Sequence, residues 1–136
     1  STAIHIRFFN NITDEYLSHL KLYINSAIKY LSSITTIHNL TFFSNDVVQL
    51  EFFIDFLLLK YDFSIFTSTS YDTPCDDLLA ISMCKNHILT NSTFGWWGAF
   101  FANSKDVIIP KENFDPCAIE GNWNSNDLAL DSWIVM

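Results

Sequence analysis

Short apolar runs alternate with stretches of helical periodicity over residues 1–110, and this alternation constrains the fold more than any other feature. Apolar residues recur every three to four positions from Leu17 to Leu31, which predicts a helix with one buried face. The pattern predicts strands at 3–6, 40–43, 63–67, 87–90 and 107–109, separated by helices at about 14–31, 47–60, 74–83 and 94–102. Such alternation predicts an α/β fold with a mostly parallel sheet and helices on both faces.

Capping residues stand where the predicted helices begin. Thr13 precedes Asp14 and Glu15, whose negative charges suit the first turn of a helix, and Pro74 opens a later helix.

The length of 136 residues and the hydrophobic fraction of 49% fit one domain with an ample core. A Rossmann-like half-domain is therefore predicted, followed by a polar tail that Trp123 and Trp133 anchor.

Charge and hydropathy exclude two classes of interaction. The net charge of −8, with only 7 scattered Lys and Arg residues, argues against a nucleic-acid partner. The longest apolar stretch, at 52–59, contains Asp55 and is shorter than the ~18 to 20 residues that span a bilayer, so no membrane span is predicted.

The chain opens on a strand without a signal peptide, and we expect it to be part of a longer protein. Its three cysteines are expected to be free, buried thiols.

Polar residues follow each of the first four predicted strands. They are Arg7 after the first, Ser44 and Asp46 after the second, 67–70 after the third, and 91–93 after the fourth. Ligands of open parallel sheets bind beyond the carboxyl ends of the strands, so these residues are the candidates for a binding site.

The segment 91–98 combines hydroxyl groups with the start of a helix. Asn91, Ser92 and Thr93 precede two glycines and a Trp pair, and free N–H groups at such a helix start favour a phosphate. The alternative is that Ser92 and Thr93 only cap the helix and that the tryptophans only pack in the core.

The first strand and the third helix carry further candidates. His5 and Arg7 share one face of the strand, because side chains alternate along it. Arg7 is suited to clamping phosphate oxygens, whereas His5 could be an ordinary core residue. Asp76 and Asp77 either complement the helix dipole or recognise a base or ribose.

Several motifs together resemble glycosyltransferase family 11, the galactoside α-1,2-fucosyltransferases. The resemblance is carried by Asp77-Leu78, by Ser82-Met83-Cys84-Lys85-Asn86-His87-Ile88 and by Asn91-Ser92-Thr93-Phe94-Gly95-Trp96-Trp97-Gly98-Ala99. Phe43-Ser44-Asn45-Asp46 and Val107-Ile108-Ile109-Pro110 are similar to further segments of the family, in the same order over about residues 1–115.

The resemblance implies the C-terminal half of a GT-B-like fold, with a GDP-fucose-binding domain at 1–115 and a tail packed on it at 116–136. The implied reaction is an inverting, metal-independent transfer of fucose from GDP-fucose to the 2-hydroxyl of a terminal galactose on a glycan acceptor. No cofactor is expected. Arg7 is implied as the catalytic residue, and the residues implied in donor binding are His5, Arg7, Asp46, Asp77, Asn91, Ser92 and Thr93. No general base is identified.

Two positions depart from the family's His-x-Arg-Arg-x-Asp motif. Phe8 stands where the second Arg is expected, and Asn10 stands where the Asp is expected. The alternative to an active enzyme is therefore a nucleotide-sugar-binding pseudoenzyme, and a gain of transfer on Phe8→Arg would support a crippled enzyme. The family implies the lumenal side of the Golgi membrane for a eukaryotic member and the cytoplasm for a bacterial one.

Overall fold

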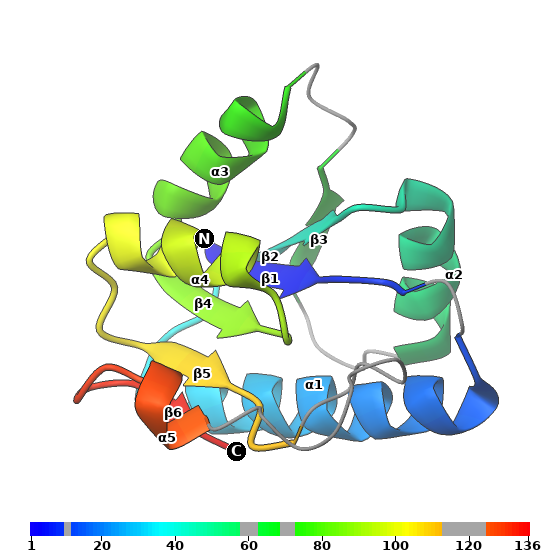
Figure 1. The fold of residues 1–136 in the computed structure, drawn as a ribbon, viewed down its shortest axis with the longest axis horizontal. Helices are drawn as coiled ribbons and strands as arrows, with labels where there is room; N and C mark the ends of the chain where they lie inside the picture. The colour runs from blue at the N-terminus through cyan, green and yellow to red at the C-terminus, as the bar shows by residue number, and fades with distance from the viewer. Residues whose placement is uncertain (10–11, 58–62, 69–72, 113–124) are drawn as a thin grey trace.

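A parallel sheet forms the centre of the molecule and confirms the predicted α/β, Rossmann-like class (Figure 1). The structure, a computed structural model, describes residues 1–9, 12–57, 63–68, 73–112 and 125–136. The strands of the described sheet are β1 (Thr2–Ile6), β2 (Asn39–Ser44), β3 (Ser64–Thr67), β4 (Asn86–Leu89), β5 (Val107–Ile109) and β6 (Ile134–Val135). They lie in the order β3-β2-β1-β4-β5-β6, and every adjacent pair is parallel.

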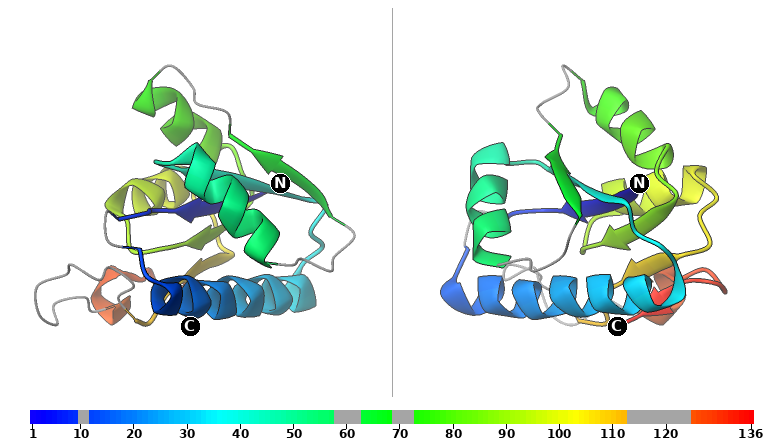
Figure 2. Two further views of the ribbon diagram at one scale, coloured as in Figure 1. Left: turned by 90° about the vertical axis from the view of Figure 1, so that its right-hand side faces the viewer. Right: turned by 180° about the vertical axis from the view of Figure 1, so that it is seen from behind.

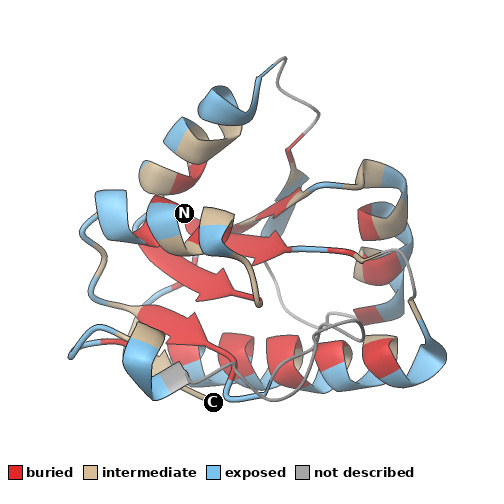
Figure 3. Ribbon diagram, in the orientation of Figure 1, coloured by how far each residue is buried: buried red, intermediate tan, exposed pale blue. Residues whose placement is uncertain are grey.

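Helices cover both faces of the sheet, as the alternation predicts (Figure 2). On one face lie α1 (Asp14–Ile34) and α2 (Val47–Leu57), whose buried residues share a core with Ile4 and Ile6 of β1. On the other lie α3 (Pro74–Ser82) and α4 (Thr93–Phe101), where Ala3 packs with Ile81. The central strands β1, β4 and β5 are buried between these layers (Figure 3), as expected of a parallel sheet that helices cover on both faces.

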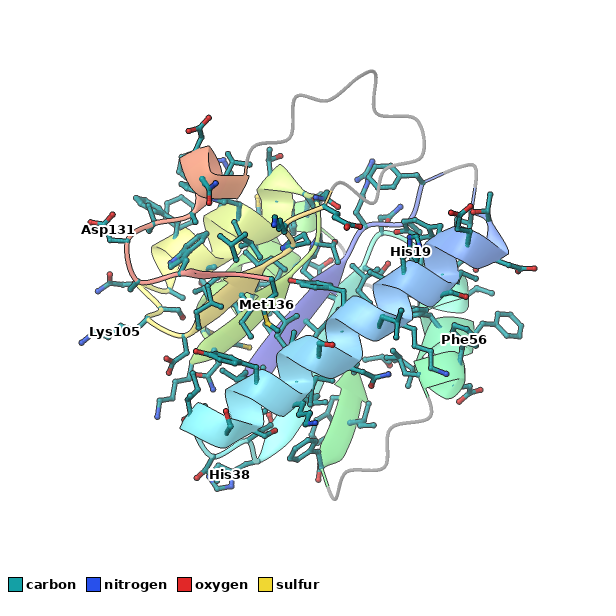
Figure 4. The ribbon with its side chains drawn as sticks, turned by 90° about the horizontal axis from the view of Figure 1, so that it is seen from below. His19, His38, Phe56, Lys105, Asp131 and Met136 are labelled. Carbon is teal, nitrogen blue, oxygen red and sulfur yellow. The ribbon has the colours of Figure 1, made fainter. Side chains whose placement is uncertain are left out.

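The predicted cap of α1 is in place, because the Thr13 side chain accepts a hydrogen bond from the backbone N–H of Tyr16. At the start of α3, Pro74 opens the helix as predicted, and the structure adds Thr73 as its cap, whose side chain accepts from the backbone N–H of Asp76. In the view of Figure 4, α1 runs obliquely across the sheet, from the end that carries His19 towards His38, which follows the helix. None of the described helices is long and apolar enough to cross a membrane.

Two glycines allow α4 to lie close to its neighbours. A Cβ at Gly98 would stand 2.3 Å from Cγ2 of Ile81, so this glycine permits the close packing of α4 on α3. A Cβ at Gly95 would stand 2.9 Å from Nδ1 of His5, so this glycine makes room for a side chain of the central strand. The helix predicted at 94–102, which the structure places at Thr93–Phe101, thus packs against both α3 and the sheet.

The C-terminal segment is more integrated than the predicted polar tail. Residues 125–128 form α5 (Ser125–Leu128), and β6 extends the sheet beside β5. Trp133 is buried, as predicted, and the Trp96 indole N–H donates to the Leu128 carbonyl over 2.8 Å. Trp123 and the predicted domain boundary at residue 115 lie outside the described residues, so both stay predictions.

Within the described residues α2 reaches Leu57, and the predicted end of that helix at residue 60 lies outside them, so it stays a prediction. The expectation of buried cysteines needs correction. Cys75 and Cys84 are free thiols, as expected, but Cys75 is exposed and Cys84 is only partly buried. Cys75 lies in the first turn of α3 and Cys84 follows its last turn, so neither belongs to the face of the helix that packs on the sheet. Cys117 lies outside the described residues.

Candidate functional site

A cleft of about 350 Å³ opens at the carboxyl edge of the sheet, beyond β1, β2 and β3. Its volume falls in the range of small-molecule sites, roughly 300 to 1,000 Å³. The residues that line it come from the strand ends, from the start of α2 and from the first turns of α3 and α4: His5, Arg7, Phe43, Ser44, Asn45, Val47, Ser68, Thr73, Pro74, Asp77 and Phe94. The cleft lies beside β1, next to the point between β1 and β4 where the strand order reverses, and open α/β sheets bind ligands at this edge.

Arg7 brings a positive charge to this cleft. It follows the last residue of β1, and its side chain is exposed. Among the described residues that line the cleft, Arg7 is the single Lys or Arg. A guanidinium in this place can donate two parallel hydrogen bonds to an anionic ligand.

His5 lies beneath Arg7 on the same face of β1 and is almost entirely buried. Its ring packs against Phe94, with 5.6 Å between the ring centroids, and next to Gly95 of α4. Burial, and secondly the positive charge of Arg7, lower the pKa of His5 to about 4, so the imidazole is neutral near pH 7. Nδ1 has no hydrogen-bond partner among the described residues, although it is buried.

A carboxylate faces the cleft from α3. The Ser68 hydroxyl donates to Oδ1 of Asp77 over 2.9 Å, which ties the first turn of α3 to the end of β3. The neighbouring Asp76 instead accepts a hydrogen bond from the Thr73 hydroxyl over 2.9 Å and does not line the cleft. The two acids therefore separate: Asp76 belongs to the helix cap, and Asp77 belongs to the cleft.

The other predicted site residues lie outside the lining of this cleft. Oδ1 of Asp46 accepts from the N–H of Gln49 over 3.0 Å and so caps α2. The Asn91 side chain donates to the Glu112 carbonyl over 3.2 Å. Ser92 occupies the N-cap of α4 without a side-chain capping bond, and Thr93 is exposed. Of the segment 91–98, the residue that reaches the cleft is Phe94.

Phe8 points away from the cleft, although it follows Arg7 directly. It is buried in the core under α2, where its ring meets Phe53 edge-on with 6.0 Å between centroids. The side chain at position 8 thus lies on the opposite side of the chain from the Arg7 side chain, as strand alternation requires. Asn10, the other departure from the family motif, lies outside the described residues.

Sequence reasoning did not single out several residues of the lining. Phe43, Val47 and Phe94 supply apolar walls, and Thr73 and Asn45 supply polar ones. Their apolar or capping character is equally typical of a core or a helix start, so composition alone could not identify them. Two signals could have found them: each lies within three residues of a strand end or a helix start, and Phe43, Asn45 and Phe94 lie in segments that carry the family resemblance.

Comparisons with known proteins agree with the geometry. The family model of glycosyl transferase family 11 matches residues 4–135. The chain is 30% identical over 141 aligned positions to the O-antigen biosynthesis glycosyltransferase WbnK of Escherichia coli. That alignment covers 98% of this chain and 44% of the relative, so the chain spans less than half the length of the relative. No solved structure gives a significant match.

Proposed function

The chain belongs to glycosyl transferase family 11, and from this premise we propose that the cleft binds GDP-fucose, with Arg7 at the diphosphate. The observation that carries the proposal is the position of Arg7, whose exposed guanidinium lines a cleft at the point where Rossmann-like sheets bind nucleotides. A bidentate guanidinium matches the oxygens of a diphosphate, and the local positive charge counts for more than the net charge of the chain.

The remaining lining residues suit the rest of such a ligand. Asp77 can accept hydrogen bonds from the ring N–H and amino groups of guanine or from ribose hydroxyls, and Ser68 holds it in place. Phe43, Val47 and Phe94 offer apolar surface to a base or a sugar ring. We assign Asp46, Asn91, Ser92 and Thr93 to a secondary role at the same edge of the sheet, where a bound donor that extends beyond the cleft could reach them.

The proposed reaction is the transfer of fucose to the 2-hydroxyl of a terminal galactose, with inversion and without a metal. The oxygen of the galactose 2-hydroxyl forms a bond to C1 of fucose and gives up its proton to water, while the bond from C1 to the β-phosphate oxygen breaks and its electron pair leaves with GDP. Negative charge then develops on the departing GDP, and Arg7 stabilises that charge. Family membership and the family motifs support this reaction.

The second candidate is a nucleotide-sugar-binding domain without turnover. It is favoured by the burial of Phe8, because the position where the family motif has a second Arg contributes no charge to this cleft. Binding would then depend on Arg7, while the stabilisation of a leaving diphosphate would lack one charge-assisted hydrogen bond.

One assay separates the two candidates. The purified chain is incubated with GDP-fucose and a terminal galactoside, and fucosylated product is measured by mass spectrometry beside donor binding by calorimetry. Product that disappears in Arg7→Ala supports the transferase. Donor binding without product supports the binding domain, and a chain that neither binds donor nor forms product contradicts both.

A further inference from the structure

The backbone of Arg7 lies beyond the last ladder pairs of its strand. The register of β1 with β4 ends at His5 and Leu89, and that with β2 ends at Ile6 and Ser44. Residues 7 and 8 therefore project past the sheet, where a chain usually gains freedom. Here their four backbone polar groups are hydrogen-bonded by side chains from three different parts of the fold.

Thr90 holds the N–H side of Arg7. Its buried hydroxyl oxygen accepts a hydrogen bond from the Arg7 N–H over 3.1 Å and donates one to the His5 carbonyl over 3.1 Å. Thr90 comes directly after β4, the strand that lies beside β1 at the reversal of strand order. One hydroxyl thus bridges the two strands where their backbone ladder stops.

Tyr16 and Asn45 hold the other side. The Tyr16 hydroxyl, from the first turn of α1, donates to the Arg7 carbonyl over 3.0 Å. The Asn45 side chain accepts from the Phe8 N–H over 2.8 Å and donates to the Phe8 carbonyl over 3.0 Å. The Phe8 ring adds a hydrophobic anchor against Phe53.

We propose that Thr90, Tyr16 and Asn45 are positioning residues that fix the backbone of Arg7, so that its guanidinium reaches the diphosphate from a rigid base. This inference rests on the proposed donor binding in the cleft. The Arg7 side chain is long and exposed, and binding a ligand costs it rotamer freedom. A backbone that is already ordered removes the further cost of fixing the main chain on binding.

The test uses two variants that remove one hydroxyl each from residues outside the lining of the cleft, Thr90→Val and Tyr16→Phe. The matched control is Tyr23→Phe, which removes a buried hydroxyl of the same helix that donates to the Leu89 and Ile108 carbonyls. Each protein is titrated calorimetrically with GDP and with guanosine, at a temperature where circular dichroism shows it to be folded.

We expect each positioning variant to bind GDP about five-fold more weakly, the effect of one net hydrogen bond. Guanosine, which has no phosphate, should bind them as it binds the unmodified chain. In an Arg7→Ala background the same substitutions should no longer change GDP affinity, because they act through Arg7. Tyr23→Phe should change stability without changing the affinity for GDP.

Each other outcome is decisive. If the unmodified chain binds GDP and the variants match it, the positioning role is wrong while the proposed function stands. If the variants lose GDP and guanosine equally, or if the loss persists in Arg7→Ala, the hydroxyls serve only the fold. If the unmodified chain binds neither ligand, the proposed function fails. Amide ¹⁵N relaxation measures the backbone motion of residues 7 and 8. If neither hydroxyl substitution increases this motion, the proposal that these side chains make the backbone of Arg7 rigid is wrong.

Discussion

The neighbouring residues 7 and 8 have different roles, because their side chains point to opposite sides of the chain. Arg7 lines the cleft, whereas Phe8 lies in the core under α2. In the sequence, Phe8 stands where the family motif has an Arg, which suggests that the binding site has lost a positive charge. In the structure it is an apolar residue in an apolar place, and a charge at this position would enter the core instead of the cleft.

Phe8→Arg should therefore destabilise the chain instead of raising transfer. It removes a buried ring and places a charge beside Phe53, so the free energy of unfolding should fall by about 3 kcal/mol or more. Urea denaturation followed by circular dichroism measures this loss. Phe8→Leu, which keeps the site apolar, should cost clearly less. A Phe8→Arg protein of undiminished stability with stronger transfer would contradict the placement of this side chain.

His5 makes the stability of the chain depend on pH. The pKa of His5 is lowered from 6.5 to about 4, chiefly by burial and secondly by Arg7. Between these values the unfolded chain takes up a proton that the folded chain does not, so stability is complete above about pH 6.5 and falls as the pH approaches 4. Burial also lowers the pKa of His87, against the raising effect of its bond to the Ile81 carbonyl, and so acts in the same direction.

The free energy of unfolding should thus fall by on the order of 3 kcal/mol from His5 alone between pH 7 and pH 4. Urea denaturation at a series of pH values measures it. His5→Gln, which cannot titrate, should show a shallower fall that retains the contribution of His87. Equal pH dependence in both proteins would show that His5 titrates normally and is not buried as described.

At the scale of elements, the alternation of apolar runs and helical periodicity was sufficient to predict the strands β1 to β5 and the helices α1 to α4. Long periodic segments such as α1 carry a strong signal, and residues such as Thr13 and Pro74 mark the starts of helices. The strand β6 was not predicted, because two paired residues, Ile134 and Val135, are too few to show a period. Its pairing with β5 depends on tertiary contacts.

The packing of β6 and α5 against α4 depends on Trp133. Its buried side chain shares a cluster with Leu89 and Ile109, and its ring lies 5.6 Å from that of Trp96. Trp133→Ala should lower the free energy of unfolding by about 3 to 5 kcal/mol. Trp97→Ala is the matched control, because Trp97 is 46% exposed on α4 and should cost much less. Urea denaturation followed by far-ultraviolet circular dichroism measures both, and equal losses would contradict the docking of this segment.

At the scale of the whole molecule, the edge of the sheet that carries the site was predictable, but the exact set of residues was not. The rule that ligands bind beyond the carboxyl ends of parallel strands led to Arg7 and to the neighbourhood of Ser44 and Ser68. The set of residues that line the cleft depends on how α3 and α4 are oriented relative to that edge of the sheet. The orientation of these helices depends on tertiary contacts such as that of Gly98 with Ile81, which no local sequence pattern encodes.

The measurement that tests the account most directly is a titration of the ¹⁵N-labelled chain with GDP, followed by amide chemical shifts, with UDP as the control nucleotide. We predict saturable shifts at Arg7, Asn45, Ser68 and Asp77, strong for GDP and weak for UDP, with little change on the outer face of α1. Arg7→Ala should weaken the binding that these shifts report. Shifts confined to other surfaces, or the absence of any saturable shift with GDP, would contradict the assignment of this cleft as the donor site.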